Sequence, residues 1–455
     1  MSSAPITPDA VAPVLPRSAA HFGLCLLALA GGLGAIWLLA AVNTGVDSGD
    51  TLLVTMIACA VVAAIVGAGD LFWLRVYRNA STGLSATSLR RADPLRIVVR
   101  LWGLALTLGL ILFAYWLFPE YGSWYDTYWR FLHYAAMVLL PLAPFYFWWT
   151  DKHLENPKDA YWHLGMLALR GRLRDADGPL LRAHFMGWTV KAFFLALMVV
   201  FLNNDVRVLV STLHGGFGFN ELRQYGFLYN LSYTVDLLFC VVGYTVTLRL
   251  FDSHIRSTEP TAFGWVIAII CYQPFWDAVI GKFYLHYDDD IFWDNWLSPW
   301  PAIRAVWPVI IVSLLFIYSL ATVSFGLRFS NLTYRGIITS GPYRYSKHPA
   351  YLSKNLSWWL ISVPWVSNQG WHEALRNSCL LGLISFVYYL RARTEERHLS
   401  KDPDYVAYAL WIEQHGLLRG LGRLLPFLRY RPPATPSAVA EPAPLPAKAR
   451  PAKRK

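Results

Sequence analysis

The sequence predicts an all-α protein, a polytopic transmembrane helical bundle of about ten spans that ends in a helical hairpin. The chain of 455 residues is 55% hydrophobic and only 15% charged, whereas a soluble protein carries nearer a quarter charged residues. The apolar residues come in long blocks separated by charged loops, which is typical of a chain that crosses a bilayer repeatedly. Many of the 21 Trp, 25 Tyr and 25 Phe residues stand at block ends, where membrane interfaces favour them.

Most of the apolar blocks are long enough to span a bilayer, which takes roughly 20 helical residues. In chain order they cover residues 22–42, 51–73, 97–118, 128–149, 185–204, 227–250, 262–280, 303–325, 352–366 and 374–390. The block 352–366 is short and ends near Pro364, so we expect a broken or re-entrant helix there. Glycines at 31, 32 and 34 lie inside the first block and indicate close helix packing.

Basic residues set the expected orientation. They gather in the loops 74–100, 150–184 and 326–351, while the intervening loops are neutral or acidic, most clearly at Asp288-Asp289-Asp290. Because cytoplasmic loops carry the excess of Lys and Arg, we expect both termini in the cytoplasm. The same bias explains the net charge of +11, so we predict the membrane as a partner and no nucleic acid.

The sequence predicts no disulfide framework and no metal site. All five cysteines lie inside apolar blocks, far from one another in the chain, at positions 25, 59, 240, 271 and 379. The histidines at 133, 163, 184 and 286 show neither His-x-x-x-His spacing nor a carboxylate-rich pattern.

Residues 335–399 concentrate the polar chemistry of the chain. Gly341-Pro342 predicts a turn, and His348-Pro349 predicts a second break with His348 at a helix boundary. Tyr351 then starts an apolar run, so a His, a Tyr and free backbone amides stand at a helix N-terminus, where polar ligand groups bind. Beyond the hairpin, Arg391 and Glu395 are four residues apart and share a helix face.

Together these residues fit one pattern: Gly-Pro-Tyr, His-Pro-x-Tyr, a hydrophobic hairpin, an Arg followed by paired glutamates, Tyr-x-x-Tyr and Leu-Pro-Phe. The chain supplies it with Gly341, Pro342, Tyr343, His348, Pro349, Tyr351, Arg391, Glu395, Glu396, Tyr405, Tyr408, Leu425, Pro426 and Phe427. With this set, residues 320–430 resemble the integral membrane methyltransferases of the isoprenylcysteine carboxyl methyltransferase and phospholipid methyltransferase type. Asn331-Leu332 and Arg335-Gly336 upstream also fit.

The resemblance implies an S-adenosylmethionine site built from both ends of a cofactor-binding helical hairpin at the cytoplasmic face. The residues expected to bind the cofactor are Tyr345, His348, Pro349, Tyr351, Leu352, Glu395 and Glu396. Arg391 and Glu396 are the expected catalytic residues, and Arg391 is also the expected anchor for an acceptor carboxylate. The resemblance further implies a lipophilic or lipid acceptor carrying a carboxylate, an amine or a hydroxyl.

The chain departs from that pattern at three places. Lys347 replaces the usual Arg before His-Pro, and residues around Asp402-Pro403 replace the usual Phe-Gly. The position of the small residue that usually follows Tyr-hydrophobic is taken by Ser353. Upstream, Asp236 lies in the middle of an apolar block. A charge at that depth faces either a partner helix or a cavity, so Asp236 is a weaker substrate-binding candidate.

These assignments divide the chain into four parts. They are a cytoplasmic segment 1–21, an N-terminal membrane domain 22–302 of about seven spans, a methyltransferase-like catalytic membrane domain 303–430, and a disordered basic Pro/Ala-rich tail 431–455.

Two other functions stay open from the sequence. The first is an NADPH-dependent oxidoreductase like the sterol reductases, which have about ten spans and a related C-terminal element; here Ala350 stands where that element has Asn. The second is a non-catalytic transporter or scaffold, although the two halves show no inverted hydropathy repeat.

Overall fold

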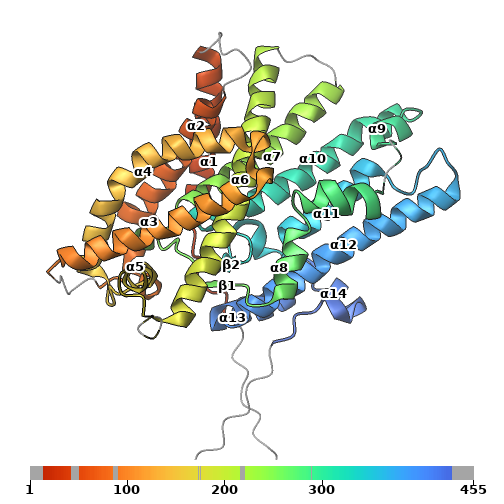
Figure 1. The fold of residues 1–455 in the computed structure, drawn as a ribbon. Coiled ribbons are helices and arrows are strands. Elements are labelled where there is room, and N and C mark those ends of the chain that lie inside the picture. Colours follow the sequence, from red (N-terminus) through yellow and green to blue (C-terminus); the bar gives the residue numbers. More distant parts are fainter. Residues whose placement is uncertain are drawn as a thin grey trace, which may run out of the picture.

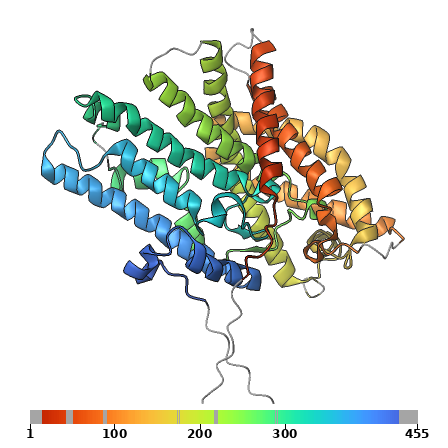
Figure 2. The same ribbon diagram turned by 180° about the vertical axis from the view of Figure 1, so that it is seen from behind.

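The computed structural model describes residues 14–42, 51–85, 91–172, 174, 176–215, 221–287, 289 and 291–432. They form an almost entirely helical bundle (Figure 1, and from behind in Figure 2). Most of the expected tail, the first 13 residues of the N-terminal segment, and Asp288 and Asp290 of the acidic loop lie outside the described residues.

The helices and strands follow one another along the chain. The helices are α1 (Phe22–Val42), α2 (Leu52–Ala68), α3 (Pro94–Leu117), α4 (Asp126–His153), α5 (Ala160–Arg170), α6 (Gly178–His214), α7 (Glu221–Thr245), α8 (Ala262–Ile269), α9 (Trp293–Trp296), α10 (Pro301–Val323), α11 (Pro349–Ser362), α12 (Trp371–Leu399), α13 (Pro403–His415) and α14 (Leu421–Leu424). The strands β1 (Ser257–Thr258) and β2 (Thr333–Tyr334) pair antiparallel.

The predicted fold class is confirmed. Within the described ranges, seven helical segments are long and apolar enough to cross a membrane. They are Phe22–Val42, Leu52–Trp73, Pro94–Leu117, Ser123–His153, Gly178–His214, Leu222–Thr245 and Pro301–Val323. The chain is therefore an integral membrane protein that crosses the bilayer several times.

Three of the predicted spans do not qualify as such helices. The prediction for 262–280 is wrong: α8 ends at Ile269, a turn follows, and a π-helix covers Trp276–Tyr284. Pro274 lies in that turn, where it has no N–H to continue a helix. The short α11 of 14 residues reaches only about 21 Å, less than the hydrocarbon core. The long α12 carries charged residues at both ends.

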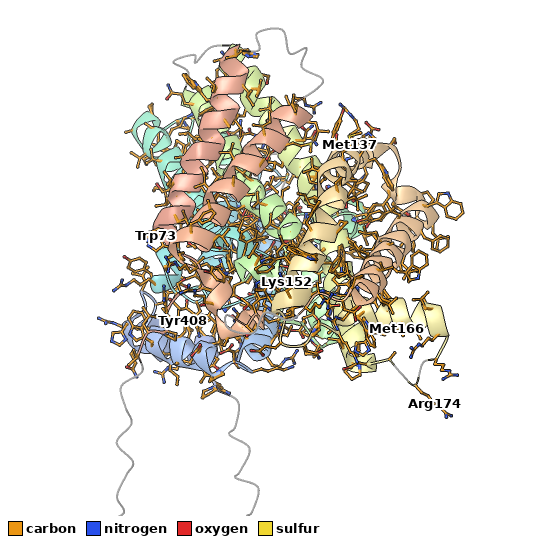
Figure 3. All side chains as sticks on the ribbon, turned by 90° about the vertical axis from the view of Figure 1, so that its left-hand side faces the viewer. Trp73, Met137, Lys152, Met166, Arg174 and Tyr408 are labelled. Carbon is orange, nitrogen blue, oxygen red and sulfur yellow. The ribbon has the colours of Figure 1, made fainter. Side chains whose placement is uncertain are left out.

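The helices α3 and α4 present apolar side chains outward. Leu110 and Phe113 of α3 and Met137 and Phe145 of α4 are all more than half exposed. Figure 3 shows Met137 well above Arg174 and Tyr408, which lie toward the lower end of the molecule. A belt of exposed apolar residues with charged residues below it is the surface expected of a protein embedded in lipid.

Glycines allow helices to approach closely, as the first block predicted. A Cβ on Gly31 would lie 2.5 Å from Ile65 Cδ1, and one on Gly32 would lie 2.7 Å from Val62 Cγ2, both in α2. A closer approach joins α3 and α5, because a Cβ on Gly103 would lie 1.9 Å from the carbonyl oxygen of Tyr161. Small residues at these crossings let the backbones pack directly.

The two expected membrane domains pack against each other. The helix α7, in the N-terminal part, lies between α6 and α10, and the strand β1 before residue 302 pairs with β2 after it. Near the described N-terminus, Thr339 donates to the carbonyl of Pro16, and Leu15 packs with Tyr405 and Tyr430. The two described chain ends therefore lie together, beside α13.

Candidate functional site

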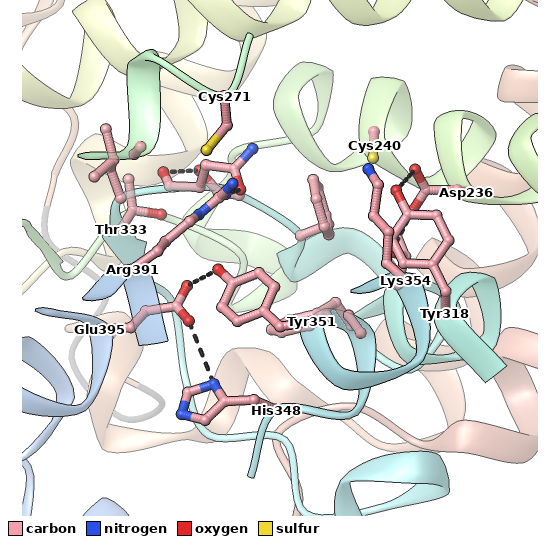
Figure 4. Close-up of a pocket in the computed structure, with 18 of the residues that line it drawn as sticks. Asp236, Cys240, Cys271, Tyr318, Thr333, His348, Tyr351, Lys354, Arg391 and Glu395 are labelled. Atoms are coloured by element: carbon pink, nitrogen blue, oxygen red, sulfur yellow. Dashed lines mark hydrogen bonds and ion pairs between the residues drawn. The ribbon is translucent and has the colours of Figure 1, made fainter. Parts of the chain in front are cut away.

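A cavity of about 690 Å³ lies where the two parts of the chain meet. Side chains from α6, α7, α10, α11, α12 and α13 line it, together with the segment 328–338. Its volume falls in the range of small-molecule and cofactor sites. Of the residues that the sequence proposed for a site, Asp236, His348, Tyr351, Arg391 and Glu395 line this cavity (Figure 4).

The start of α11 brings His348 and Tyr351 to the cavity. His348 is the residue just before the helix, and Pro349 is its first residue, so the predicted helix boundary is confirmed. Proline suits that position because its missing N–H would have no partner in the first turn. The rings of His348 and Tyr351 lie parallel with centroids 5.6 Å apart.

Glu395 of α12 faces both of these residues. The Tyr351 hydroxyl donates a hydrogen bond to Glu395 Oε1 at 3.1 Å, and His348 Nδ1 lies 3.7 Å from Glu395 Oε2. Figure 4 shows these two contacts as dashed lines. The Glu395 side chain is still 36% exposed, so its carboxylate is open to a ligand.

Glu396 has a different place from its neighbour. It is buried and is not among the cavity-lining residues. It contacts Lys347 at 3.1 Å, His348 at 3.2 Å and Arg393 at 2.5 Å. Burial alone would raise the pKa of Glu396, but the hydrogen bond with His348 and the charges of His348, Lys347 and Arg393 lower it to about 2. Glu396 therefore positions the His348 ring and does not itself face the cavity.

Arg391 is surrounded by aromatic rings. Its guanidinium lies 5.2 Å from the ring centroid of Tyr351 and 5.4 Å from that of Tyr272. Its Nη2 donates to Asn331 Oδ1 at 2.5 Å and to the Tyr272 hydroxyl at 3.3 Å. Among the described residues none accepts a hydrogen bond from Nε or Nη1, which leaves donors for an anionic or carbonyl group in the cavity.

Three predicted cofactor contacts lie away from the cavity lining. Tyr345 is 61% exposed, because its carbonyl accepts from Leu417 N and its ring faces outward. Leu352 is exposed as well: it is one residue beyond Tyr351, and that step rotates a helical side chain by about 100°. Pro349 is buried in the helix start. The sequence pattern located this segment but not which side chains face the cavity.

Asp236 belongs to a second polar cluster on the cavity wall. Its two carboxylate oxygens each accept a hydrogen bond at 2.5 Å, one from the Tyr318 hydroxyl and one from the Thr322 hydroxyl. Lys354 of α11 lies beside them (Figure 4). Neither Lys354 nor Tyr318 was predicted as a site residue. The available signal was a lysine inside an apolar block, which is costly unless it faces a partner or a cavity.

Within the part of the chain that the structure describes, no three His, Cys, Asp or Glu residues are grouped so as to hold a metal ion. Comparison of the chain with protein-family models, with curated proteins and with solved structures gives no match.

Proposed function

We propose that the protein is an integral membrane S-adenosylmethionine-dependent methyltransferase that acts on a lipophilic acceptor near the cytoplasmic face. One observation carries the proposal. The two ends of the predicted hairpin meet at one cavity, where Glu395 contacts His348 and also Tyr351, which precedes it by 44 residues. These are the segments in which the sequence pattern resembles the methyltransferases.

The residues present fit the chemistry of such a cofactor. S-Adenosylmethionine carries a sulfonium, an ammonium, a carboxylate and ribose hydroxyls. The Glu395 carboxylate can accept from the ammonium or the ribose, and the free donors of Arg391 can bind the carboxylate. The sulfonium would be attracted by the Glu395 carboxylate, because the rings of Tyr272, Tyr351 and Tyr388 already surround the Arg391 cation.

The bound cofactor would supply an activated methyl group. The protein's own contribution is to bind and orient both reactants and to exclude water, because methyl transfer is an in-line displacement that needs no covalent enzyme intermediate. Tyr351 holds Glu395 in place through its hydroxyl. Glu396, which is paired with Lys347, holds the His348 ring. Arg391 would orient an anionic group of a reactant.

The apolar part of the cavity suits a lipophilic acceptor. Phe201, Leu237, Trp276, Phe325 and Trp358 are among its lining residues. The proposed orientation places both termini and the Glu395 end of the cavity in the cytoplasm. Support comes from the basic loop 150–184, whose Arg174 lies toward the same end of the molecule as Tyr408 of α13 (Figure 3).

The test is calorimetric titration of the detergent-purified full chain with S-adenosylhomocysteine, beside NADP⁺. We expect S-adenosylhomocysteine to bind and the Glu395→Gln variant to bind it about tenfold more weakly, which is the worth of one charge-assisted hydrogen bond. Glu373→Gln is the matched control, because Glu373 lies at the far end of α12 and pairs with Arg376.

Binding of NADP⁺ in place of S-adenosylhomocysteine would replace the proposal with the reductase alternative. If the chain binds neither molecule, the enzyme proposal fails and a transporter or scaffold role takes its place.

A further inference from the structure

The cavity has a second polar region, on the other side of Tyr351 from Glu395. Figure 4 shows Lys354, Asp236 and Tyr318 grouped there, while Glu395 and Arg391 lie on the opposite side of the Tyr351 ring. The three residues come from α11, α7 and α10, and all of them line the cavity. No residue of this group belongs to the methyltransferase-like sequence pattern.

Lys354 is a partly buried cation surrounded by aromatic rings. Its Nζ lies 4.8 Å from the ring centroid of Tyr318, 5.4 Å from that of Trp358 and 6.0 Å from that of Tyr233. Among the described residues none accepts a hydrogen bond from its Nζ, and the side chain lines the cavity. An ammonium has three N–H donors, and a buried cation needs acceptors. A ligand in the cavity would supply them.

Asp236 balances the charge of Lys354 without occupying its donors. The two opposite charges interact, but both carboxylate oxygens already accept from the hydroxyls of Tyr318 and Thr322. The Lys354–Asp236 pair is thus close to neutral, and Lys354 is the member of the pair without a hydrogen-bond partner among the described residues. A carboxylate on the ligand would be repelled by Asp236, and an ammonium would be repelled by Lys354. A neutral oxygen is repelled by neither Asp236 nor Lys354.

We propose that Lys354 binds a neutral carbonyl or hydroxyl oxygen on a lipophilic ligand whose body lies along Tyr233, Tyr318 and Trp358. Assigning that ligand as the methyl acceptor rests on the function proposed above. The acceptor would then carry a neutral oxygen away from the methylated atom, and Lys354 would fix its depth in the cavity. The binding of the oxygen itself does not depend on methyl transfer.

The test compares lipophilic probes of similar length in calorimetric titrations of the detergent-purified full chain, with titrations into detergent alone subtracted. The probes are decyl methyl ketone, dodecane and laurate. We expect the wild-type protein to bind the ketone about tenfold more tightly than dodecane and than laurate, the size of one hydrogen bond to a charged donor. Lys354→Met should abolish the preference over dodecane, because methionine keeps the length and removes the donors.

Two variants sharpen the test. Lys191→Met is the matched control, because Lys191 also lies on an aromatic ring, 4.1 Å from the Trp188 centroid, but does not line the cavity. It should keep the ketone preference. Asp236→Asn should shift the preference toward laurate, because Lys354 then faces the ligand with its charge unbalanced.

A wild-type protein that does not distinguish the ketone from dodecane overturns the inference, whatever the folding of the variants. So does a wild-type preference for laurate, or a ketone preference that survives in Lys354→Met. S-Adenosylhomocysteine separates the two proposals. If it binds while the ketone preference is absent, the Lys354 inference alone fails. If a Lys354-dependent ketone preference is found without S-adenosylhomocysteine binding, the methyltransferase proposal alone fails.

Discussion

Arg391 Nη2 donates to Asn331 Oδ1 at 2.5 Å, so a residue of the loop before the hairpin fixes an arginine that follows it by 60 positions. The contact is buried, and it turns the remaining guanidinium donors toward the cavity. The loop itself is anchored by the amide N–H of Asn331, which donates to the Tyr244 hydroxyl at 2.8 Å. The position of Arg391 therefore depends on α7 as well as on α12.

Asn331→Ala should release Arg391. We expect a loss of about 1–3 kcal/mol of stability from the buried donor that is left unpaired, and about tenfold weaker binding of S-adenosylhomocysteine. Thermal unfolding and calorimetry measure the two effects. Asn204→Ala is the control, because the bond between Asn204 and Arg207 is exposed. Unchanged ligand affinity in Asn331→Ala would contradict a role of Arg391 in binding.

Tyr351→Phe should weaken S-adenosylhomocysteine binding several-fold with little loss of stability, because it removes only the hydroxyl that orients Glu395. Calorimetric titration checks the affinity. Tyr389→Phe provides the comparison, since its hydroxyl donates to the carbonyl of Phe427 and does not line the cavity. Equal affinities of the two variants would exclude an orienting role for Tyr351.

Ionised Glu396 should stabilise the folded protein, and this contribution to the free energy of unfolding should be lost in acid. Its pKa is lowered from 4.5 to about 2 in the folded protein, so its contribution is fully present above about pH 4.5 and is lost as the pH falls toward 2. The shift corresponds to about 3 kcal/mol. Unfolding temperatures of the wild type and of Glu396→Gln, followed by tryptophan fluorescence between pH 7 and pH 3, should therefore converge in acid. A constant difference over that range would refute the assignment.

Gly103→Ala should separate α3 from α5. The new Cβ would meet the carbonyl oxygen of Tyr161 at 1.9 Å, and such overpacking costs about 1–3 kcal/mol. Gly109→Ala in the same helix is the control, because nothing lies within 4 Å of its Cβ position. We expect a lower unfolding temperature for the first variant and no decrease for the second. Equal unfolding temperatures would contradict the close crossing.

The sequence predicted the fold well because long apolar blocks and helix-starting prolines are local features. Where local composition was ambiguous, prediction failed: the apolar block 262–280 contains Pro274 and is broken. The site was predicted in part. The pattern correctly placed four residues at one cavity: His348, Tyr351, Arg391 and Glu395. Their spacing at the start of α11 and within α12 is a local feature that can be read from the sequence.

The remaining site residues are set by tertiary packing. Tyr318 and Asp236 are 82 positions apart, and no spacing rule joins α10 to α7. Tyr345 and Leu352 were expected in the cofactor site, but the backbone turn at Tyr345 and the helical phase at Leu352 direct their side chains outward. The paired glutamates look equivalent in the sequence. Neighbouring side chains of a helix point about 100° apart, and so Glu395 is exposed to the cavity while Glu396 is buried.

The shared walls of the cavity have a consequence for how this protein can be taken apart. A fragment that starts at residue 303 would keep His348, Arg391 and Glu395 but would lack Asp236 and Tyr272. It would also lose the strand β1 that pairs with the loop carrying Asn331. Residues 303–430 alone would therefore not form the cavity. Moving their motif residues into another membrane protein would leave out the walls that α7 and Tyr272 supply.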